Sequence, residues 1–365
     1  MRSPFGSVGL SVASASAAVA LLSACGAGGS PAPDGAATES FSCDAPTSAS
    51  STTTVSVAAL PLTTSGALYM GINDGTFEKY GLDVEIQPVA DIAAAMASVQ
   101  GGASNFAFAP TISLFAADAN GAPLKMVAPF AGIAPGYYDK MKAGEPGWEI
   151  EAAALVTKSD SGLDNAGDLD GRTVGLIDVK GQSELATRAV IDDNGGDSDS
   201  VKFLNMPLAD GLNAFLAGKV DAIYTTDPFL GRAVEAGGQV ISWVGVEALR
   251  QGLNSSMVAS ESYIAENPGT VARFNCAMRE SNVNANANHD GVRRAIAQAQ
   301  DVPFSTFENA TMAYFYSCAP KNDLENFQDL MLEYDMLSEK VDVEDLLIPE
   351  TLCEEPDLSS YRPNS

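Results

Sequence analysis

The sequence is poor in the residues on which most enzymes and nucleic-acid-binding proteins depend. It holds one histidine, His289, and 20 Lys and Arg against 47 Asp and Glu, for a formal net charge of -27. A single histidine leaves general-base catalysis short of its usual side chain, and such an excess of negative charge repels a phosphate backbone. We therefore expect no binding of nucleic acid. We expect His289, just after the Asn-rich stretch 282–288, on the solvated surface.

The motifs of several large enzyme classes are also missing. The sequence has no Walker loop, no dinucleotide-binding glycine fingerprint and no His/Cys cluster of the kind that holds a catalytic metal. The run Gly181-Gln182-Ser183-Glu184-Leu185 lacks the second glycine of a nucleophile elbow. We expect no catalytic residues, no metal and no cofactor.

Long hydrophobic runs are scarce as well. The apolar stretch Val8 to Leu22 spans 15 residues and includes three serines, which is shorter than the roughly 20 residues of a membrane-spanning helix. It follows Arg2 and is typical of a signal peptide. The next residues, Leu22-Ser23-Ala24-Cys25-Gly26, resemble the bacterial lipobox, whose cysteine receives lipid. We expect a signal peptide over 1–24 and lipid on Cys25; the alternative is a secreted protein with an incidental cysteine at its cleavage site.

Residues 25–52 are expected to form a lipidated, flexible linker. Most of them are Gly, Ala, Ser, Pro or Thr, too few large apolar groups to offset the entropy of ordering. A chain of this length has a root-mean-square span of roughly 30 Å. The linker therefore predicts a folded body that moves close to a membrane.

Four further cysteines belong to the expected extracytoplasmic body, where disulfides persist. We expect Cys276 to pair with Cys318, on neighbouring helices, and Cys43 with Cys353, near the two ends of the body. Spacing alone leaves the other connectivities and free buried thiols open.

From Thr53 onward, short β-rich runs alternate with amphipathic helical segments, which indicates an α/β fold. One helix should place Leu208, Leu212, Phe215 and Leu216 on a buried face. The expected strands are 53–59, 83–87, 106–109 and 124–128, then 152–157, 173–176, 201–204 and 222–225, and later 256–259. We assign 53–145 and 240–365 to a first lobe and 146–239 to a second, each a mixed sheet flanked by helices.

Four turns follow expected strands and begin expected helices. Ligands of open α/β sheets gather at such positions, and the partial positive charge of a helix start can hold an anion or a polar head. The alternative is plain helix capping, which needs no ligand. The candidate ligand-binding residues are Thr63, Thr64 and Ser65; Phe108, Pro110 and Thr111; Lys180, Gly181, Gln182 and Ser183; and Thr226 and Asp227.

Two of these residues favour opposite ligands. Lys180 suits a sulfonate, nitrate or carboxylate, whereas Asp227 suits a cationic or amino-bearing group such as an aminopyrimidine. The sequence leaves both open.

One segment resembles the ABC-transporter solute-binding proteins for nitrate, sulfonates, taurine and thiamine precursors. It runs from Gly66-Ala67-Leu68-Tyr69 to Gly75-Thr76-Phe77-Glu78-Lys79-Tyr80-Gly81-Leu82-Asp83-Val84. Further similar segments follow in the family's order: Gln100 to Ala109, Gly121 to Lys125, Asp168 to Gly175, Ala217 to Ala222 and Asp227-Pro228-Phe229. Two positions depart from the family pattern: Asn105 stands where aspartate is frequent, and Thr157 where arginine is usual.

The resemblance implies a two-lobed periplasmic-binding-protein fold of type II that closes on a small-molecule solute. It further implies a monomer at the outer face of the cell membrane that presents the solute to an ABC permease. The alternatives are an enzyme resembling those of thiamine-pyrimidine biosynthesis, and a lipoprotein that reports a ligand to a membrane sensor.

Overall fold

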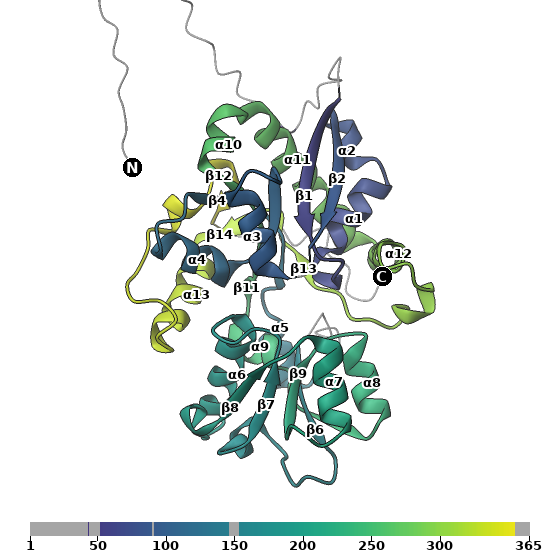
Figure 1. The fold of residues 1–365 in the computed structure, drawn as a ribbon, viewed down its shortest axis with the longest axis vertical. Coiled ribbons are helices and arrows are strands. Elements are labelled where there is room, and N and C mark those ends of the chain that lie inside the picture. The colour runs from purple at the N-terminus through teal and green to yellow at the C-terminus, as the bar shows by residue number, and fades with distance from the viewer. Residues whose placement is uncertain (1–42, 44–51, 90, 146–152, 355–365) are drawn as a thin grey trace, which may run out of the picture. The chain divides into compact units, whose positions relative to one another are not determined.

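The computed structural model describes residues 43, 52–89, 91–145 and 153–354 (Figure 1). The expected signal peptide, Cys25 and nearly all of the linker lie outside the described residues. Within the described ranges, none of the helices combines the length and apolar character that a membrane span requires.

The first sheet has five strands in the order β2-β1-β3-β12-β4. Strand β1 is parallel to β2 and β3, whereas β12 is antiparallel to β3 and β4. The expected strand 53–59 is therefore confirmed, and the late strand inserts between two early ones. The strands are β1 (Thr53–Ala59), β2 (Leu82–Pro88), β3 (Phe106–Pro110), β4 (Leu124–Pro129) and β12 (Ser255–Ser260).

Both faces of this sheet are buried, because neighbouring side chains of a strand point to opposite faces. Val57 belongs to one hydrophobic cluster and the adjacent Ala58 to the other. The first cluster includes side chains of α1 (Gly66–Asn73), α11 (Pro268–Ala287) and α12 (His289–Ala299). The second includes side chains of α3 (Ile92–Gln100), α4 (Thr111–Ala119) and α13 (Lys321–Glu333). Shorter helices are α2 (Thr76–Lys79) and α10 (Glu261–Glu266).

The second sheet also has five strands, in the order β10-β6-β9-β7-β8. Helices α6 (Gln182–Asp193) and α9 (Val244–Leu249) cover one face, and α7 (Leu208–Leu216) and α8 (Phe229–Glu235) cover the other (Figure 1). The strands are β6 (Ala154–Lys158), β7 (Thr173–Leu176), β8 (Lys202–Asn205), β9 (Ala222–Thr225) and β10 (Gly238–Ser242).

The chain passes from the first sheet to the second between β4 and β6, and returns between β10 and β12. Strand β10 spans the expected boundary at residue 240 and belongs to the second sheet; the division into two lobes stays a prediction. Near these passages lie α5 (Tyr137–Ala143) and a small sheet of β11 (Gly252–Leu253), β5 (Ala131–Ile133) and β13 (Tyr314–Phe315).

Helix α7 departs from the expected pattern at one position. Leu212 and Phe215 are buried as predicted, but Leu216 is 44% exposed. Leu212 and Phe215 pack into the core of the sheet, whereas Leu208 is only half-buried and the last turn leaves Leu216 facing solvent. The expectation that Leu216 belongs to the buried face is wrong.

Asn282 and Asn286 of the Asn-rich stretch are buried in the core, whereas Ala287 and Asn288 are exposed. The side-chain amide of Asn282 donates to the carbonyls of Pro129 and Tyr316, and Asn286 both donates to and accepts from the backbone of Phe315. These asparagines supply hydrogen bonds that the ends of β4 and β13 would otherwise lack.

His289 is buried too, with 4% of its surface exposed, which corrects the expectation that it lies on the solvated surface. It begins α12, which packs against α1 and α11. Burial, together with the positive charge of Arg293, lowers the pKa of His289 to about 4, while Asp290 opposes the shift. This burial was missed because a single polar residue after a polar stretch carries no sign of its helix face.

The predicted disulfide pairing is wrong, although all four cysteines pair. Cys43 bonds to Cys276, with Cα atoms 5.3 Å apart, and Cys318 bonds to Cys353, with Cα atoms 5.8 Å apart. Cys318 lies just before β14 (Ala319–Pro320), which runs parallel to β15 (Leu352–Cys353). This strand pairing brings Cys353 within bridging distance, and no local pattern predicts it.

Candidate functional site

The carboxyl ends of the parallel strands form the natural ligand-binding edge of each sheet. In the first sheet these are the ends of β1, β2 and β3, and in the second the ends of β7, β8 and β9. All four predicted turns lie at these edges. Their side chains differ in whether they are available to a ligand.

The turn 63–65, which follows β1, makes hydrogen bonds mainly within the fold. The hydroxyl of Ser65 donates to the carbonyl of Leu62 and accepts from the N–H of Leu62, at 2.8 and 3.0 Å. Ser65 is fully buried and Thr63 nearly so, whereas Thr64 is partly exposed. The capping interpretation of Ser65 is therefore the one that the geometry favours.

The turn after β3 is structural as well. Phe108 is buried, and its ring meets that of Phe130 edge-on at 5.8 Å between centroids. The hydroxyl of Thr111 donates to the carbonyl of Leu253 at 2.9 Å, and Thr111 is fully buried. Pro110 is partly exposed. Phe108 and Thr111 thus hold this edge of the sheet together.

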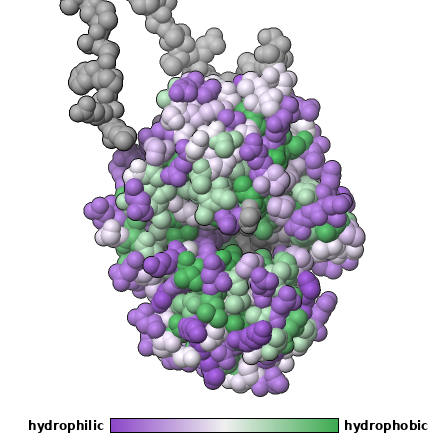
Figure 2. Space-filling model, in the orientation of Figure 1, coloured by the Kyte–Doolittle hydropathy of each residue, from purple (hydrophilic) through white to green (hydrophobic). Residues whose placement is uncertain are grey.

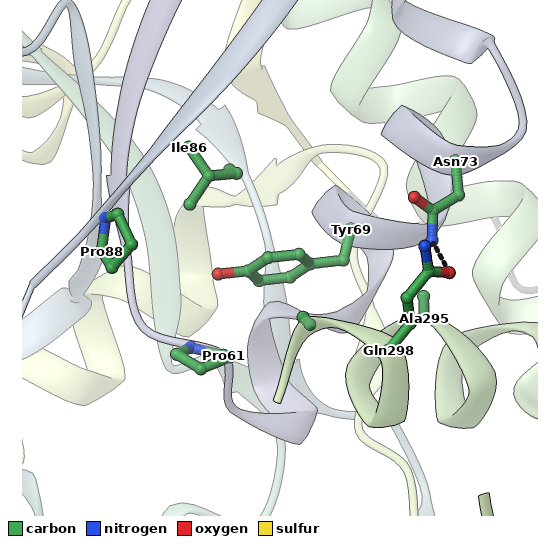
Figure 3. A pocket seen from close by; sticks show the side chains of 8 residues that line it. Pro61, Tyr69, Asn73, Ile86, Pro88, Ala295 and Gln298 are labelled. Atoms are coloured by element: carbon green, nitrogen blue, oxygen red, sulfur yellow. Dashed lines mark hydrogen bonds between the residues drawn. The ribbon is translucent and has the colours of Figure 1, made fainter. Parts of the chain in front are cut away.

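A cavity of about 330 Å³ lies beside the ends of β1 and β2 (Figure 3). The ring of Tyr69 extends across it from α1, with its hydroxyl directed toward Pro61 and Pro88. On the other side, the side chain of Asn73 donates to that of Gln298 at 3.3 Å. Burial raises the pKa of Tyr69 to about 12, so its phenol stays protonated at neutral pH. Sequence reasoning missed Tyr69, although it lies in the segment that resembles the solute-binding family.

The turn after β7 begins α6 and contains a carboxylate, Asp178, that the sequence analysis did not single out. Asp178 accepts hydrogen bonds from the backbone N–H groups of Gln182 and Ser183, at 3.0 and 2.8 Å, and from the hydroxyl of Ser183. Gly181 is a glycine for a steric reason, since a Cβ there would lie 2.3 Å from a carboxylate oxygen of Asp178.

Burial raises the pKa of Asp178, the hydrogen bonds from Ser183 and Gln182 oppose the rise, and the neighbouring charge of Glu184 adds to it. Its two neighbours in the chain are apolar and exposed, Ile177 at 40% and Val179 at 41%. Figure 2 shows hydrophobic residues beside a hollow in the middle of the molecular face that it presents.

Lys180 occupies the same turn with its side chain exposed. Its φ of 62° places it in the left-handed region, which costs a non-glycine residue free energy. Its backbone N–H donates to Glu184 at 2.8 Å, and Glu184 also pairs with Arg188 at 2.7 Å. The carboxylate of Glu184 therefore helps to maintain this unusual backbone conformation.

The turn after β9 ends in Asp227. One carboxylate oxygen of Asp227 accepts from the backbone N–H of Thr311 at 3.1 Å and from its hydroxyl at 3.3 Å. Thr311 precedes β13, which pairs with β5 rather than with any strand of the second sheet. The neighbouring Thr226 is partly exposed and accepts from Leu230 through its carbonyl.

The two departures from the family pattern have structural roles here. The side-chain oxygen of Asn105 accepts from the N–H and hydroxyl of Ser56, at 2.8 and 3.1 Å, and thereby links β1 to the start of β3. The hydroxyl of Thr157 is buried and donates to the carbonyl of Leu163 at 3.4 Å. Across the described residues, no group of three or more His, Cys, Asp and Glu side chains is placed to hold a metal.

Comparison with solved structures identifies the architecture. The alkanesulfonate-binding protein of Xanthomonas axonopodis pv. citri, bound to MOPS, matches with a TM-score of 0.60 and 16% identity over 84% of this chain and 99% of its own. The periplasmic nitrate-binding protein NrtA of Synechocystis PCC 6803 gives 0.61 and 13%, over 80% and 84%. The desulfurization enzyme DSZB gives 0.58 and 15%, over 82% and 97%. At these identities the likeness shows the fold alone.

The sequence comparisons give the family. No curated protein sequence matches the chain significantly. The model of the NMT1/THI5-like family matches residues 63–135 and 148–290, which is more than half of the chain. The protein therefore has the α/β architecture of the periplasmic binding proteins and belongs to the NMT1/THI5-like family.

Proposed function

We propose that this protein is the solute-binding component of an ABC importer, which captures a small organic molecule at the facing edges of its two sheets. The observation that carries the proposal is the hydrogen-bonded contact of Asp227, at the end of β9, with Thr311, in a segment that continues into the small sheet of β5. The ligand-binding edge of the second sheet thus faces structure connected to the first. Closure of two such units on a solute is a common basis for delivery to a permease.

Family membership and fold both support this assignment, since the sulfonate- and nitrate-binding proteins named above share the architecture. The protein would act as a monomer at the outer face of the cell membrane. Cys25 would carry the lipid, and residues 26–42, up to the disulfide-bonded Cys43, would form the leash. A leash of that length spans roughly 23 Å.

The test has two parts. Native mass spectrometry of the purified body, residues 43–365, should show a bound small molecule or a mass increase with a candidate solute. In cells, deletion of the gene should abolish uptake of that solute, and the wild-type gene should restore it. A folded, ligand-free protein that binds no solute of a broad panel, in cells whose uptake is unaffected by the deletion, would refute the proposal.

The anchor is tested separately with Cys25→Ser. The variant should appear in the medium or periplasm, bind solute as well as the wild type does, and support uptake poorly, because it is no longer held beside the permease. Cys43→Ser is unsuitable as a control because Cys43 is disulfide-bonded. Ser23→Thr, two positions before Cys25, serves instead as a conservative change that should leave anchoring intact.

The likeness to a desulfurization enzyme raises a second candidate, catalysis at the same edges. The described residues include four cysteines, all in disulfides, and the one histidine is buried with a pKa of about 4. A catalytic mechanism that needs a free thiol or a solvent-accessible imidazole could not use these cysteines or this histidine. Product analysis by mass spectrometry after incubation with the identified solute separates the two candidates, since a binding protein returns it unchanged.

A further inference from the structure

The first turn of helix α6 already binds a carboxylate of the chain itself, that of Asp178. A helix of 12 residues presents unpaired N–H groups and partial positive charge at its first turn. Here Asp178 accepts from the N–H groups of Gln182 and Ser183 and from the Ser183 hydroxyl. Three donors that could hold a sulfonate or nitrate at this turn are therefore in use.

The residues packed around Asp178 fix its carboxylate at the start of α6. Gly181 has no side chain at the place where a Cβ would lie 2.3 Å from the carboxylate. Ser183 is fully buried, and besides bonding the carboxylate its hydroxyl accepts from the N–H of Asp178 at 3.2 Å. An entering anion would have to displace a carboxylate held by three donors. It would also meet that charge at close range, which is unfavourable.

Arg188 is not available to offset this negative charge. Arg188 pairs with Glu184 at 2.7 Å and with Asp199 at 2.9 Å, so its guanidinium is engaged in two ion pairs. Lys180 is exposed, and its own backbone N–H is directed to Glu184 rather than outward. Asp227 adds a second carboxylate at the same edge, because β7 and β9 are parallel neighbours.

The turn also exposes apolar surface next to the side chain of Lys180. Ile177 and Val179 flank Asp178 on both sides and are about two-fifths exposed. A solute that meets this turn would find hydrocarbon surface, carboxylate acceptors and the exposed Lys180 side chain, while the N–H groups of Gln182 and Ser183 are already bonded to Asp178.

We propose that Asp178 is a specificity-determining residue that closes the α6 start to anions. The solute is then an organic molecule with an apolar body and a neutral or cationic head that donates hydrogen bonds; inorganic anions and sulfonates are excluded. The inference rests on the proposed function, of which it narrows the substrate class.

The experiment compares anion binding by the wild-type body with that of Asp178→Ser, using sodium methanesulfonate, sodium nitrate and sodium sulfate. Sodium chloride at equal ionic strength is the reference, and calorimetry with thermal unfolding gives the half-saturating concentrations. The wild type should bind none of the three below 10 mM. Asp178→Ser frees the N–H groups of Gln182 and Ser183 and should bind at least one of them at least tenfold more tightly than the wild type does.

Two further variants keep the result interpretable. Asp178→Asn removes the charge but retains one acceptor, so it should fold even if the serine variant does not, with a smaller gain in anion affinity. Asp342→Ser is the matched control, because Asp342 caps a short helix elsewhere by accepting from Glu344; it should gain none. Circular dichroism establishes that each variant is folded.

Wild-type binding of any of these anions below 10 mM would overturn the inference, as would a sulfonate or nitrate found bound to the native protein. An absence of gain in both folded Asp178 variants would overturn it as well. Failure of the proposed importer function would give a different result. Uptake would then be independent of the gene, while the increase in anion affinity of Asp178→Ser could still be measured.

Discussion

The carboxylate of Asp227 accepts two hydrogen bonds from Thr311, one from its backbone N–H and one from its hydroxyl. The two residues are 84 positions apart in the chain and belong to segments of different sheets. A hydrogen bond to a charged group contributes about 1.5–3 kcal/mol, so this contact helps to hold the end of β9 against the segment that leads into β13.

Asp227→Ala should lower the free energy of unfolding by about 2 kcal/mol and weaken solute binding, because the link between the end of β9 and the segment before β13 is lost. Thr311→Val removes only the hydroxyl and should cost about half as much. Urea unfolding and calorimetry measure both effects. Asp210→Ala, on the exposed side of α7, is the control, and an equal effect of this change would show that charge alone matters.

The Asn286 side chain should be among the most sensitive positions of α11. Asn286→Ala leaves the N–H and carbonyl of Phe315 without their partner, which should cost about 3 kcal/mol of unfolding free energy. Asn284→Ala, two positions away and only half-buried, should cost less than about 1 kcal/mol. Similar losses for the two variants would contradict the structural role of Asn286.

His289 should make stability depend on pH in mild acid. Its pKa is about 4 in the folded protein, against 6.5 for an exposed histidine. The unfolded chain therefore binds the proton first, so stability is full above about pH 6.5 and decreases as pH falls toward 4. The loss from this residue is about 3 kcal/mol in total.

Because the chain has one histidine, its imidazole resonances can be followed without ambiguity by NMR. A titration midpoint near 4 is expected, and a midpoint near 6.5 would show that the side chain is solvated. In His289→Gln, the unfolding free energy should fall less between pH 6.5 and 4 than it does in the wild type. The difference should be about 3 kcal/mol, the contribution expected from His289.

The two disulfides should be detected as Cys43–Cys276 and Cys318–Cys353 by peptide mapping without reduction. Replacing both Cys318 and Cys353 by serine opens a loop with a sequence separation of 35 residues. The chain-entropy relation gives a loss of about 4 kcal/mol for a loop of this size. Peptides that link Cys276 to Cys318 would contradict the structure.

The strands were the most predictable part of the fold. The ranges 53–59, 173–176 and 222–225 agree with β1, β7 and β9 at both ends, because buried parallel strands are short, β-rich runs bounded by turn residues. The helix ending at Leu216 was predicted as well, but not the exposure of Leu216, since a one-dimensional pattern does not show where the packing surface ends.

The candidate site was predictable in location and much less so in chemistry. Sequence reasoning placed Lys180, Gln182 and Ser183 at a helix start, where they are found. It did not identify Asp178, which accepts from the Gln182 and Ser183 N–H groups, because an aspartate in an acidic chain carries no distinguishing signal. Tyr69 was missed for a related reason, as an aromatic residue in a helix is usually core.

The sequence by itself determined the alternation of strands and helices, the positions of the turns and the family, because these follow from local periodicity and from short runs of residues. Only the tertiary structure decided the partners: Cys43 with Cys276, Asp227 with Thr311, and Asp178 with the first turn of α6. Such partners depend on how turns and strands distant in the chain are brought together, and on the backbone conformation of a turn such as that at Lys180. Residue type and spacing do not specify either one.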